Sequence, residues 1–369
     1  MKKALAFLFG LVGITALCII TFTLVKVGPR TIVVPDQYPT IQAAIGNATA
    51  GDTIFVKKGT YYPPASGDSI NIDKPLSLIG EDAQSTVING DYDKRWRLNW
   101  GWITIRVTAP DVTISGFTIT NSEISICLAY YSEVNPSNFR IIGNNIEGNV
   151  DGIVVEYGSS LIISGNNITK NARDGIQVSS TSTTITANKI IENGVGVAIF
   201  SSRNVTVSGN IISRNIRGLN LDWWGPFYIY ENNITDNQGC GIQFGRGCHN
   251  ATVLSNNISR NSIGINLENF LVIGDATIGS GNTVYLNNLI DNSQQAFVEK
   301  EYEYHSSDLE NGTNIIAWDN GAEGNYWSDY QTKYPNATEI ALTGIGDIPY
   351  VIDSNNKDNY PLIKAATQH

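Results

Sequence analysis

Apolar and polar residues alternate in short runs along most of the chain, and these runs recur at a fixed interval. Each recurrence begins with Asn, any residue, and then Ile or Leu, and a second Asn follows three residues later. The first five starts are 22 residues apart and two more come after longer intervals: Asn144, Asn166, Asn188, Asn210, Asn232, Asn256 and Asn287. A repeat of this length is typical of a solenoid, in which each unit packs against the next.

Every repeat has room for three short strands. The Asn-x-Ile run is the first, a Gly-apolar-x-apolar run such as residues 218–221 is the second, and a run such as residues 205–207 is the third. Alternation with a period of two indicates strands, and the Asn and Gly residues between the runs indicate turns. The sequence therefore predicts an all-β fold, a right-handed parallel β-helix with coils of about 22 residues.

The recurrent Asn residues predict an internal scaffold. The chain holds 40 Asn, more than its 24 Lys and Arg residues combined. Asn readily adopts left-handed turn conformations, and its amide can bond the amide of the neighbouring coil about 4.8 Å away. We therefore expect these residues to stack into hydrogen-bonded ladders rather than to contact a ligand.

The ends of the repeat region predict caps. Residues 38–45 read as a short amphipathic helix ahead of the first coils. A solenoid needs such caps because its terminal coils otherwise expose core and unpaired strand edges. We expect three parts: a signal-anchor or signal peptide at 1–30, the β-helix with its N-terminal cap at 31–300, and a C-terminal capping segment at 301–369.

The N-terminal segment predicts export. Residues 4–25 are 22 residues without a charge, and as a helix they span about 33 Å, close to the roughly 30 Å of a bilayer core. An uncleaved signal-anchor is favoured over a cleaved signal peptide, which usually has a shorter apolar run. Either form predicts a body outside the cytoplasm, and a retained anchor predicts attachment to the membrane. Asn-x-Ser/Thr sequons, for instance at Asn167 and Asn233, agree with export.

Charge and composition limit the classes of partner and cofactor that the chain can bind. The chain has 24 Lys and Arg against 34 Asp and Glu, so its formal charge is 24 − 34 = −10. This argues against nucleic acid, or an anionic membrane surface, as a partner held by bulk charge. Three His and one Met leave few ligands for copper. No cofactor is expected, and Ca²⁺ between the stacked Asp151 and Asp174 is the alternative to a role of these residues in turns.

The chain resembles a known superfamily in its first coils, its repeats and its tail. Residues 51–56 and 72–80, with the expected helix, resemble the first coils of pectin-lyase-like β-helix proteins. The repeat body is similar to the NosD-type and CASH (carbohydrate-binding and sugar hydrolase) group, and residues 324–330 resemble the ending of NosD-like surface proteins of archaea. The resemblance implies the fold but no one activity, because the superfamily includes lyases, hydrolases, esterases, epimerases and non-enzymes. No catalytic set of these relatives maps onto this sequence.

One outward row of the Gly-apolar-x-apolar strands carries candidate chemistry. Amides stack in this row, and aromatic residues follow on one of its strands. The candidate ligand-binding residues are Asn220, Trp223, Trp224, Gln243 and Asn266. Amides beside aromatic rings suit a sugar, which needs hydrogen-bond partners and a flat apolar platform. The alternative is a solvated sheet face beside a packed Trp loop.

Carboxylates and thiols add two further candidate sites. Asp222 and Glu268 lie two coils apart on the same face, about 9.6 Å at the usual strand spacing and near the upper end of the separation in an inverting glycosidase. They are the candidate catalytic residues, although any acidic solenoid offers such pairs. Cys240 and Cys248 are candidates for a disulfide, which is favoured over a metal site in an exported chain.

These features lead to three hypotheses. The first is a membrane-anchored, extracytoplasmic protein that binds carbohydrate or a cell-surface glycan, with binding favoured over turnover by a hydrolase or lyase. The second is a structural or adhesive cell-surface protein without catalysis. The third follows the NosD resemblance and is a periplasmic copper-site accessory protein.

Overall fold

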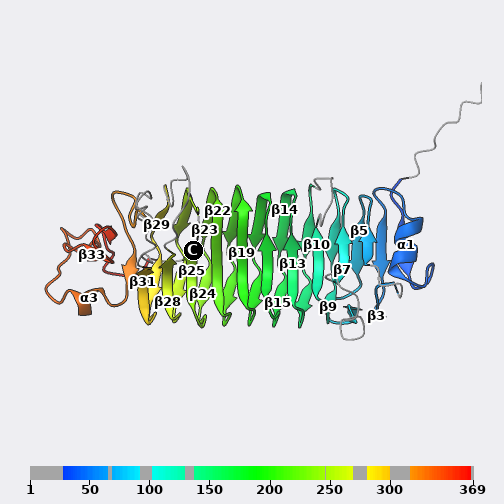
Figure 1. The fold of residues 1–369 in the computed structure, drawn as a ribbon, viewed down its shortest axis with the longest axis horizontal. Helices are drawn as coiled ribbons and strands as arrows, with labels where there is room; N and C mark the ends of the chain where they lie inside the picture. The colour runs from blue at the N-terminus through cyan, green and yellow to red at the C-terminus, as the bar shows by residue number, and fades with distance from the viewer. Residues whose placement is uncertain are drawn as a thin grey trace, which may run out of the picture.

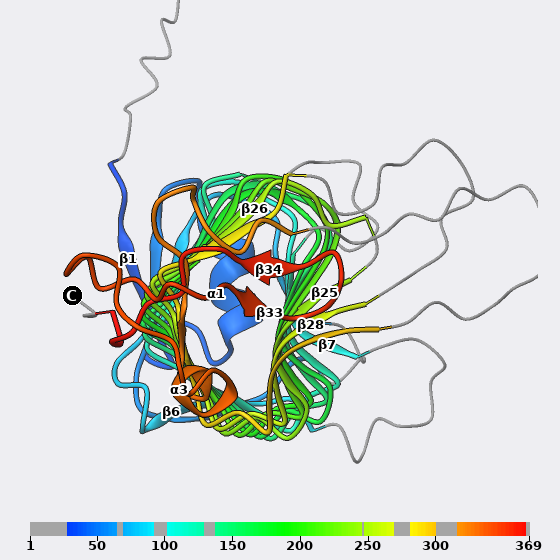
Figure 2. The same ribbon diagram turned by 90° about the vertical axis from the view of Figure 1, so that its left-hand side faces the viewer.

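The chain forms an elongated solenoid whose coils follow one another in sequence order (Figure 1). The computed structural model describes residues 28–64, 69–91, 102–128, 137–245, 247–268, 281–299 and 316–366. Over these residues three parallel sheets wind around a hydrophobic core. Figure 2 shows the sheets end-on. The expected all-β fold, a right-handed parallel β-helix, is confirmed.

Each regular coil gives one strand to each sheet, so neighbouring strands of a sheet are one coil apart in the sequence. Among the described residues, sheet A consists of β1 (Thr31–Val34), β2 (Thr53–Val56), β5 (Ser77–Gly80), β8 (Thr113–Ser115), β11 (Arg140–Ile142), β14 (Ser159–Ser164), β17 (Thr181–Thr186), β20 (Val205–Ser208), β23 (Phe227–Tyr230), β26 (Ala251–Leu254) and β29 (Thr283–Tyr285).

Sheets B and C are built in the same way from the same described residues. Sheet B consists of β3 (Gly59–Tyr61), β6 (Thr86–Asn89), β9 (Thr118–Thr120), β12 (Asn145–Glu147), β15 (Asn167–Thr169), β18 (Lys189–Ile191), β21 (Ile211–Ser213), β24 (Asn233–Thr235), β27 (Asn257–Ser259), β30 (Asn288–Ile290) and β32 (Tyr326–Trp327). Sheet C consists of β4 (Ile70–Ile72), β7 (Ile103–Val107), β10 (Ile124–Leu128), β13 (Asp151–Val155), β16 (Asp174–Val178), β19 (Val195–Ser202), β22 (Arg217–Trp224), β25 (Cys240–Phe244), β28 (Ile263–Leu267) and β31 (Gln294–Val298).

The core consists of aliphatic side chains stacked in rows along the solenoid axis. In sheet B, Ile212 is in register with Ile234, and Ile234 with Ile258. All three side chains are fully buried. Each such side chain contributes about 1.5–3 kcal/mol when it is removed from water. The same apolar position, repeated in each coil, therefore supplies the stabilisation that a globular protein obtains from one compact core.

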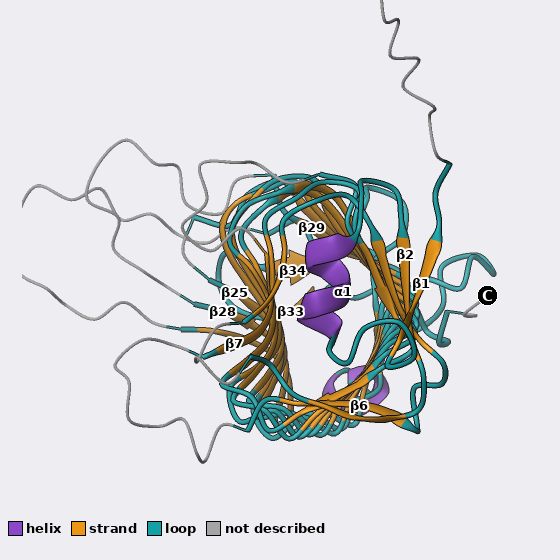
Figure 3. Cartoon of the chain, turned by 90° about the vertical axis from the view of Figure 1, so that its right-hand side faces the viewer, coloured by secondary structure: helices purple, strands orange, loops and turns teal. Residues whose placement is uncertain are grey.

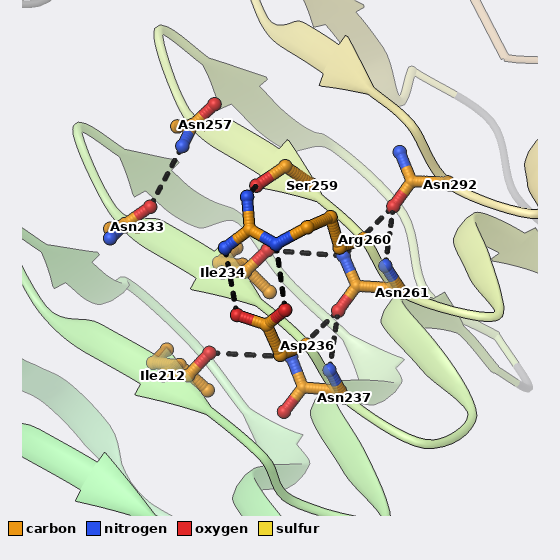
Figure 4. Close-up of polar contacts among 10 residues, drawn as sticks. All are labelled: Ile212, Asn233, Ile234, Asp236, Asn237, Asn257, Ser259, Arg260, Asn261 and Asn292. Carbon is orange, nitrogen blue, oxygen red and sulfur yellow. Dashed lines mark hydrogen bonds and ion pairs between the residues drawn. The ribbon is translucent and has the colours of Figure 1, made fainter.

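The recurrent Asn residues form two buried ladders, one at each end of the sheet B strands. The backbone N–H and Nδ2 of Asn210 both donate to Oδ1 of Asn232, at 3.0 and 2.9 Å. In the second ladder Asn237 donates in the same way to Asn261, and Asn261 to Asn292 (Figure 4). Each rung satisfies polar groups whose burial without a partner costs about 1–3 kcal/mol apiece.

The ladders confirm the expectation from the repeat. The first ladder contains Asn144, Asn166, Asn188, Asn210, Asn232, Asn256, Asn287 and Asn325. The second contains Asn149, Asn171, Asn193, Asn215, Asn237, Asn261 and Asn292.

The glycine of the Gly-apolar-x-apolar run stands where the backbones of two coils lie too close for a side chain. A Cβ atom at Gly218 would lie 2.3 Å from the backbone oxygen of Gly241 and 3.2 Å from Nδ2 of Asn237. Backbone atoms cannot move aside as a side chain can. The repeated glycine is thus a requirement of coil stacking.

A short helix covers the first coils. Helix α1 (Ile41–Asn47) buries Ile41, Ala44 and Ile45, and Oγ1 of Thr40 caps it by accepting the N–H of Ala43 at 3.1 Å. Figure 3 shows α1 lying across the opening of the solenoid. The helix expected at residues 38–45 is therefore present and begins at Ile41.

The C-terminal segment packs on the last coil. It contains α3 (Tyr330–Lys333) and the antiparallel pair β33 (Tyr350–Val351) and β34 (Lys357–Asp358). Trp327 stacks on Tyr350 with ring centroids 4.0 Å apart, and its Nε1 donates to Oδ2 of Asp358 at 2.8 Å. We propose that this segment is the C-terminal cap, within the division 1–30, 31–300 and 301–369.

No helix in the described part of the chain is both long enough and apolar enough to cross a membrane. The apolar segment at residues 4–25, for which a signal-anchor is expected, lies outside the described residues.

Candidate functional site

The outward side of sheet C places the candidate amides in one row. Asn220 of β22 is in register with Gln243 of β25, and Gln243 with Asn266 of β28. The row agrees with the stacking expected from the repeat. The three residues are 8%, 5% and 6% exposed, so the row is largely buried and is not the open, solvated face that strand alternation alone suggests.

The first two amides of the row each donate to a carboxylate. Nδ2 of Asn220 donates to Oδ2 of Asp222 at 3.0 Å within one coil. Nε2 of Gln243 donates to Oε2 of Glu268 at 2.6 Å, and Glu268 belongs to the next coil. Both candidate catalytic carboxylates are therefore held by amides of the same surface.

A third pair continues the pattern. Nδ2 of Asn266 donates to Oε1 of Glu299 at 2.9 Å, again across one coil. Together the three pairs form a surface that we call the amide–carboxylate face: Asn220, Asp222, Gln243, Glu268, Asn266 and Glu299.

Asp222 leans toward the following coil. A Cβ atom at Gly245 would lie 1.9 Å from Oδ1 of Asp222, so the glycine leaves room for the carboxylate. Burial raises the pKa of Glu268, the hydrogen bond from Gln243 lowers it, and the charges of Glu299 and Asp222 raise it again; the net shift is upward. The carboxylates of this face therefore influence one another.

Trp223 and Trp224 end β22 beside the face and are 40% and 45% exposed, so they are not a packed loop. A Cβ atom at Gly247 would lie 3.1 Å from the Trp223 ring, and the Arg203 guanidinium lies 5.2 Å from the Trp224 ring centroid. Both Trp residues have left-handed backbone, with φ of 50° and 76°. This conformation costs roughly 1–2 kcal/mol per residue. The fold thus holds two exposed indoles next to the carboxylates at an energetic cost.

A cavity of about 390 Å³ opens near the middle of sheet C. The residues that line it are Arg173, Asp174, Gln177, Gly194, Val195, Ile216 and Arg217. Burial raises the pKa of Asp174 to about 6, the charge of Asp151 adds to the shift, and Arg173 opposes it. Gln177 lies in the same outward row as Asn220, through Ala198. The cavity and the amide–carboxylate face therefore share one side of sheet C.

Asp151 and Asp174 stack as expected, but their surroundings do not favour Ca²⁺. Asp151 forms an ion pair with Arg173, and its Oδ1 also accepts the backbone N–H of Asp174 at 3.2 Å. Its charge is therefore already balanced at the strand end. Over the described ranges, no group of three or more His, Cys, Asp and Glu side chains is arranged to hold a metal ion.

The structure contradicts the disulfide expected between Cys240 and Cys248, since both thiols are free and buried. Cys240 is the first residue of β25, where its thiol faces Oε1 of Gln243 at 3.5 Å. Cys248 lies beyond the other end of the strand and belongs to the hydrophobic core. The extended strand from Cys240 to Phe244 alone spans about 13 Å, whereas the Cα atoms of a disulfide lie within about 7 Å.

Glu299 and the cavity were not found from the sequence. Glu299 occupies the position of Glu268 one coil later, because their N–H groups donate to the backbone of Leu267 and Phe244 respectively. Extending the repeat past its last long interval finds Glu299. The cavity carries no sequence signal, because its residues come from several coils and depend on the burial of their side chains.

Comparison with protein families gives a clear assignment. A sequence profile described as "Periplasmic copper-binding protein (NosD)" matches residues 45–203 and 110–332, most of the solenoid. The chain belongs to the NosD family. Its membership supports an extracytoplasmic location. No curated protein sequence matches this NosD-family chain.

The family description names copper, and the described residues of this NosD-family chain do not fit a copper site. Copper favours imidazole, thiolate and thioether ligands. Cys248 is 1% exposed within the core, and burial raises the pKa of its thiol. Nδ1 of the adjacent His249 accepts a hydrogen bond from Asn250 at 3.1 Å. The other two His residues and Met1 lie outside the described residues.

Solved structures share the fold of this NosD-family chain. A mannuronic acid specific polysaccharide family 6 lyase from human gut microbiota is 15% identical with a TM-score of 0.56, over 81% of this chain and 75% of that one. DFA-IIIase from Arthrobacter chlorophenolicus is 12% identical with a TM-score of 0.51, over 81% and 94%. The tailspike protein 2 of bacteriophage CBA120 is 10% identical with a TM-score of 0.53, and the match covers 86% of this chain but 48% of the tailspike chain. At these identities the likeness shows the fold alone.

Proposed function

We propose that this NosD-family chain is an extracytoplasmic protein that binds carbohydrate on the amide–carboxylate face. The observation that carries the proposal is the series of three amide–carboxylate pairs along the solenoid axis, beside two exposed Trp rings. Sugar hydroxyls need hydrogen-bond partners, and the apolar face of a sugar ring packs on an aromatic platform. The carboxylate and amide oxygens meet the first need, and Trp223 and Trp224 meet the second.

The repetition of the pairs favours a linear ligand. Neighbouring strands of a sheet are about 4.8 Å apart, so the polar groups recur at that interval along the axis. A polysaccharide also presents its hydroxyls as a repeat. The backbone strain at Trp223 and Trp224 supports a role for these residues beyond packing, because such strain tends to persist at binding sites.

Catalysis by Asp222 and Glu268 is the second candidate function. The raised pKa of Glu268 is a property of a general acid, and Asp222, two coils away, is the candidate second carboxylate of a hydrolase or lyase. Against turnover, each carboxylate accepts a hydrogen bond from an amide of the same surface, which ties it to the wall of the site.

We also propose that residues 4–25 attach the protein to a membrane. The uncharged length of this segment and the periplasmic family description support this role. The full chain should remain with the membrane fraction after alkaline extraction, and replacement of two central apolar residues of the segment by Lys should release it. Release of the unaltered chain would contradict the anchor.

The test of the carbohydrate proposal is a glycan array probed with the full chain, followed by product analysis for reducing and unsaturated ends. Asp222→Asn and Trp223→Ala should weaken binding about tenfold or more, as expected when a partly buried, hydrogen-bonded carboxylate or an aromatic platform is lost. Tyr228→Ala is the matched control, since Tyr228 is 41% exposed but lies on sheet A.

Three results decide between the candidate functions. Binding that is lost in both variants and retained in the control supports the proposal. Released products would add catalysis to binding. Absence of binding to any glycan would refute the proposal and favour the structural or adhesive surface protein.

A further inference from the structure

On the amide–carboxylate face the amide nitrogens already donate hydrogen bonds, and two amide oxygens remain as acceptors. The nitrogens of Asn220, Gln243 and Asn266 all donate to carboxylates. This fixes each amide, because its oxygen would be repelled by the carboxylate. Oδ1 of Asn220 and Oδ1 of Asn266 are then buried, and neither has a hydrogen-bond partner in the described part of the chain. A ligand of this face must therefore donate hydrogen bonds.

The described side chains of the face carry negative charge. Asp222, Glu268 and Glu299 bring three carboxylates together, and the first and last of them raise the pKa of Glu268 through their charges. Arg217 opposes this effect, and its contribution to that pKa is smaller than theirs. An anionic chain would be repelled here, whereas a cationic one would be attracted.

The spacing of the unpartnered oxygens excludes one metal ion as the common ligand. Asn220 and Asn266 are two coils apart, about 9.6 Å at the usual strand spacing. Ca²⁺ binds oxygens at 2.3–2.6 Å, so two ligands of one ion lie at most about 5 Å apart. An extended ligand with several donors can span this distance.

We infer that the carbohydrate bound by this face is a linear chain of amino sugars with free, protonated amino groups, lying along the solenoid axis. An ammonium group brings three donors, no acceptor and a positive charge, which matches the acceptors and carboxylates of the face. Trp223 and Trp224 provide ring faces for the sugar and favour a nearby cation. This inference rests on the proposed function and names its substrate class.

The test uses the full chain and titration calorimetry at a pH at which the probe's amines are protonated. The probes are a β-1,4-linked glucosamine hexamer, its N-acetylated counterpart, oligogalacturonate, hexalysine and CaCl₂. The glucosamine hexamer should bind about tenfold more tightly than the N-acetylated hexamer, since acetylation removes the charge and two donors from each residue. The triple variant Asp222→Asn, Glu268→Gln, Glu299→Gln should lose this preference.

Two further variants keep the test interpretable. The control is a second triple variant that removes the same number of negative charges at exposed carboxylates away from the face: Glu147→Gln, Glu231→Gln, Asp291→Asn. It should keep the preference for the glucosamine hexamer. Glu299→Gln alone should reduce the preference if the triple variant fails to fold.

Several outcomes would overturn the inference. Equal or tighter binding of the N-acetylated hexamer or of oligogalacturonate overturns it while leaving carbohydrate binding intact. Hexalysine binding as tight as the glucosamine hexamer overturns it in favour of a general polycation site, and saturable Ca²⁺ binding lost in the triple variant overturns it in favour of a metal site. Failure of every saccharide to bind overturns the proposed function as well.

Discussion

Nδ2 of Asn266 donates a 2.9 Å hydrogen bond to Oε1 of Glu299, which belongs to the next coil. The bond joins two coils on the outer side of sheet C, on the opposite side of the strand from the core. Gln243 and Glu268 make the same link between the two preceding coils. Because these bonds fix the side chains before a ligand arrives, little conformational entropy remains to be lost on binding.

The position of Asp222 should depend on the absence of a side chain at Gly245. In Gly245→Ala, the new Cβ would occupy the place of Oδ1 of Asp222, 1.9 Å away, and the carboxylate should move aside. Stability should change by less than about 1 kcal/mol, because the obstructing atom ends a side chain, while glycan binding should fall about tenfold. Thermal unfolding and calorimetry measure the two effects.

Gly46→Ala is the control for this substitution. Gly46 lies in α1, and no atom is within 4 Å of a Cβ placed there. It should leave binding unchanged. Unaltered binding in Gly245→Ala would mean that Asp222 does not contact the ligand.

Asn210 should be among the residues on which stability depends most. Asn210→Ala removes the Oδ1 acceptor of two bonds from Asn188, and it removes the Nδ2 donor that bonds Asn232 and the backbone oxygen of Ile185. Buried polar groups on the neighbouring coil are then left unpaired. We expect a loss of about 3 kcal/mol or more in the free energy of unfolding. Denaturant unfolding measures it. Gln238→Ala at an exposed site should change stability by less than about 0.5 kcal/mol, and equal effects of the two would contradict the ladder's role.

Asp174 should make stability depend on pH. Burial raises its pKa from 3.8 to about 6 in the folded protein, so the folded state holds the proton more tightly than the unfolded chain. This stabilisation is complete below about pH 3.8 and is lost as the pH rises through about 6. Asp174→Asn should therefore be more stable than the unaltered protein at pH 8 by about 1–2 kcal/mol, with a smaller gain at pH 4.

Thermal unfolding at both pH values checks the prediction for Asp174. Asp291→Asn, at an exposed carboxylate, should show no such gain. A variant Asp174→Asn that is less stable than the unaltered protein at pH 8 would contradict the assignment. Asp358, whose pKa burial also raises to about 6, stays in both proteins and cancels in the comparison.

Cys240 and Cys248 should react slowly with iodoacetamide in the native protein. Burial raises the pKa of Cys240 to about 11 and that of Cys248 further, so few thiolates are present and both are shielded. Both should be alkylated after denaturation without reductant, as peptide mass spectrometry can show. A mass equal to that of the Cys240 and Cys248 peptides joined by a disulfide would contradict this prediction and show that the disulfide forms.

The repeat made the fold predictable and left the chemistry of the face partly hidden. The stacking of Asn220, Gln243 and Asn266 follows from the repeat, because register in a parallel solenoid is set by the repeat itself. Their burial and their bonds to carboxylates do not follow from spacing, since these depend on side-chain rotamers and on the neighbouring coil.

The error at Cys240 and Cys248 has the same origin. Eight residues of sequence suggested proximity, but five of them form an extended strand that carries the two thiols apart. The cavity at Asp174 was missed because the raised pKa arises from burial by several coils, and no local motif records that burial. The spacing of residues in the sequence therefore predicts how the coils stack. The contacts between side chains of neighbouring coils determine the chemistry of the outer surface.

The direction of the ladder bonds bears on how such a protein can vary in length. Inside each ladder an Asn donates to the Asn of the following coil and accepts from the Asn of the preceding coil, so each internal coil supplies as many of these Asn–Asn donors as it uses acceptors. Removing one whole coil would bring Asn188 against Asn232 and restore the same bonds. Duplication or loss of a complete repeat is therefore neutral for the interior, and selection can change the length of the outer surface, one coil at a time, without redesigning what lies beneath it.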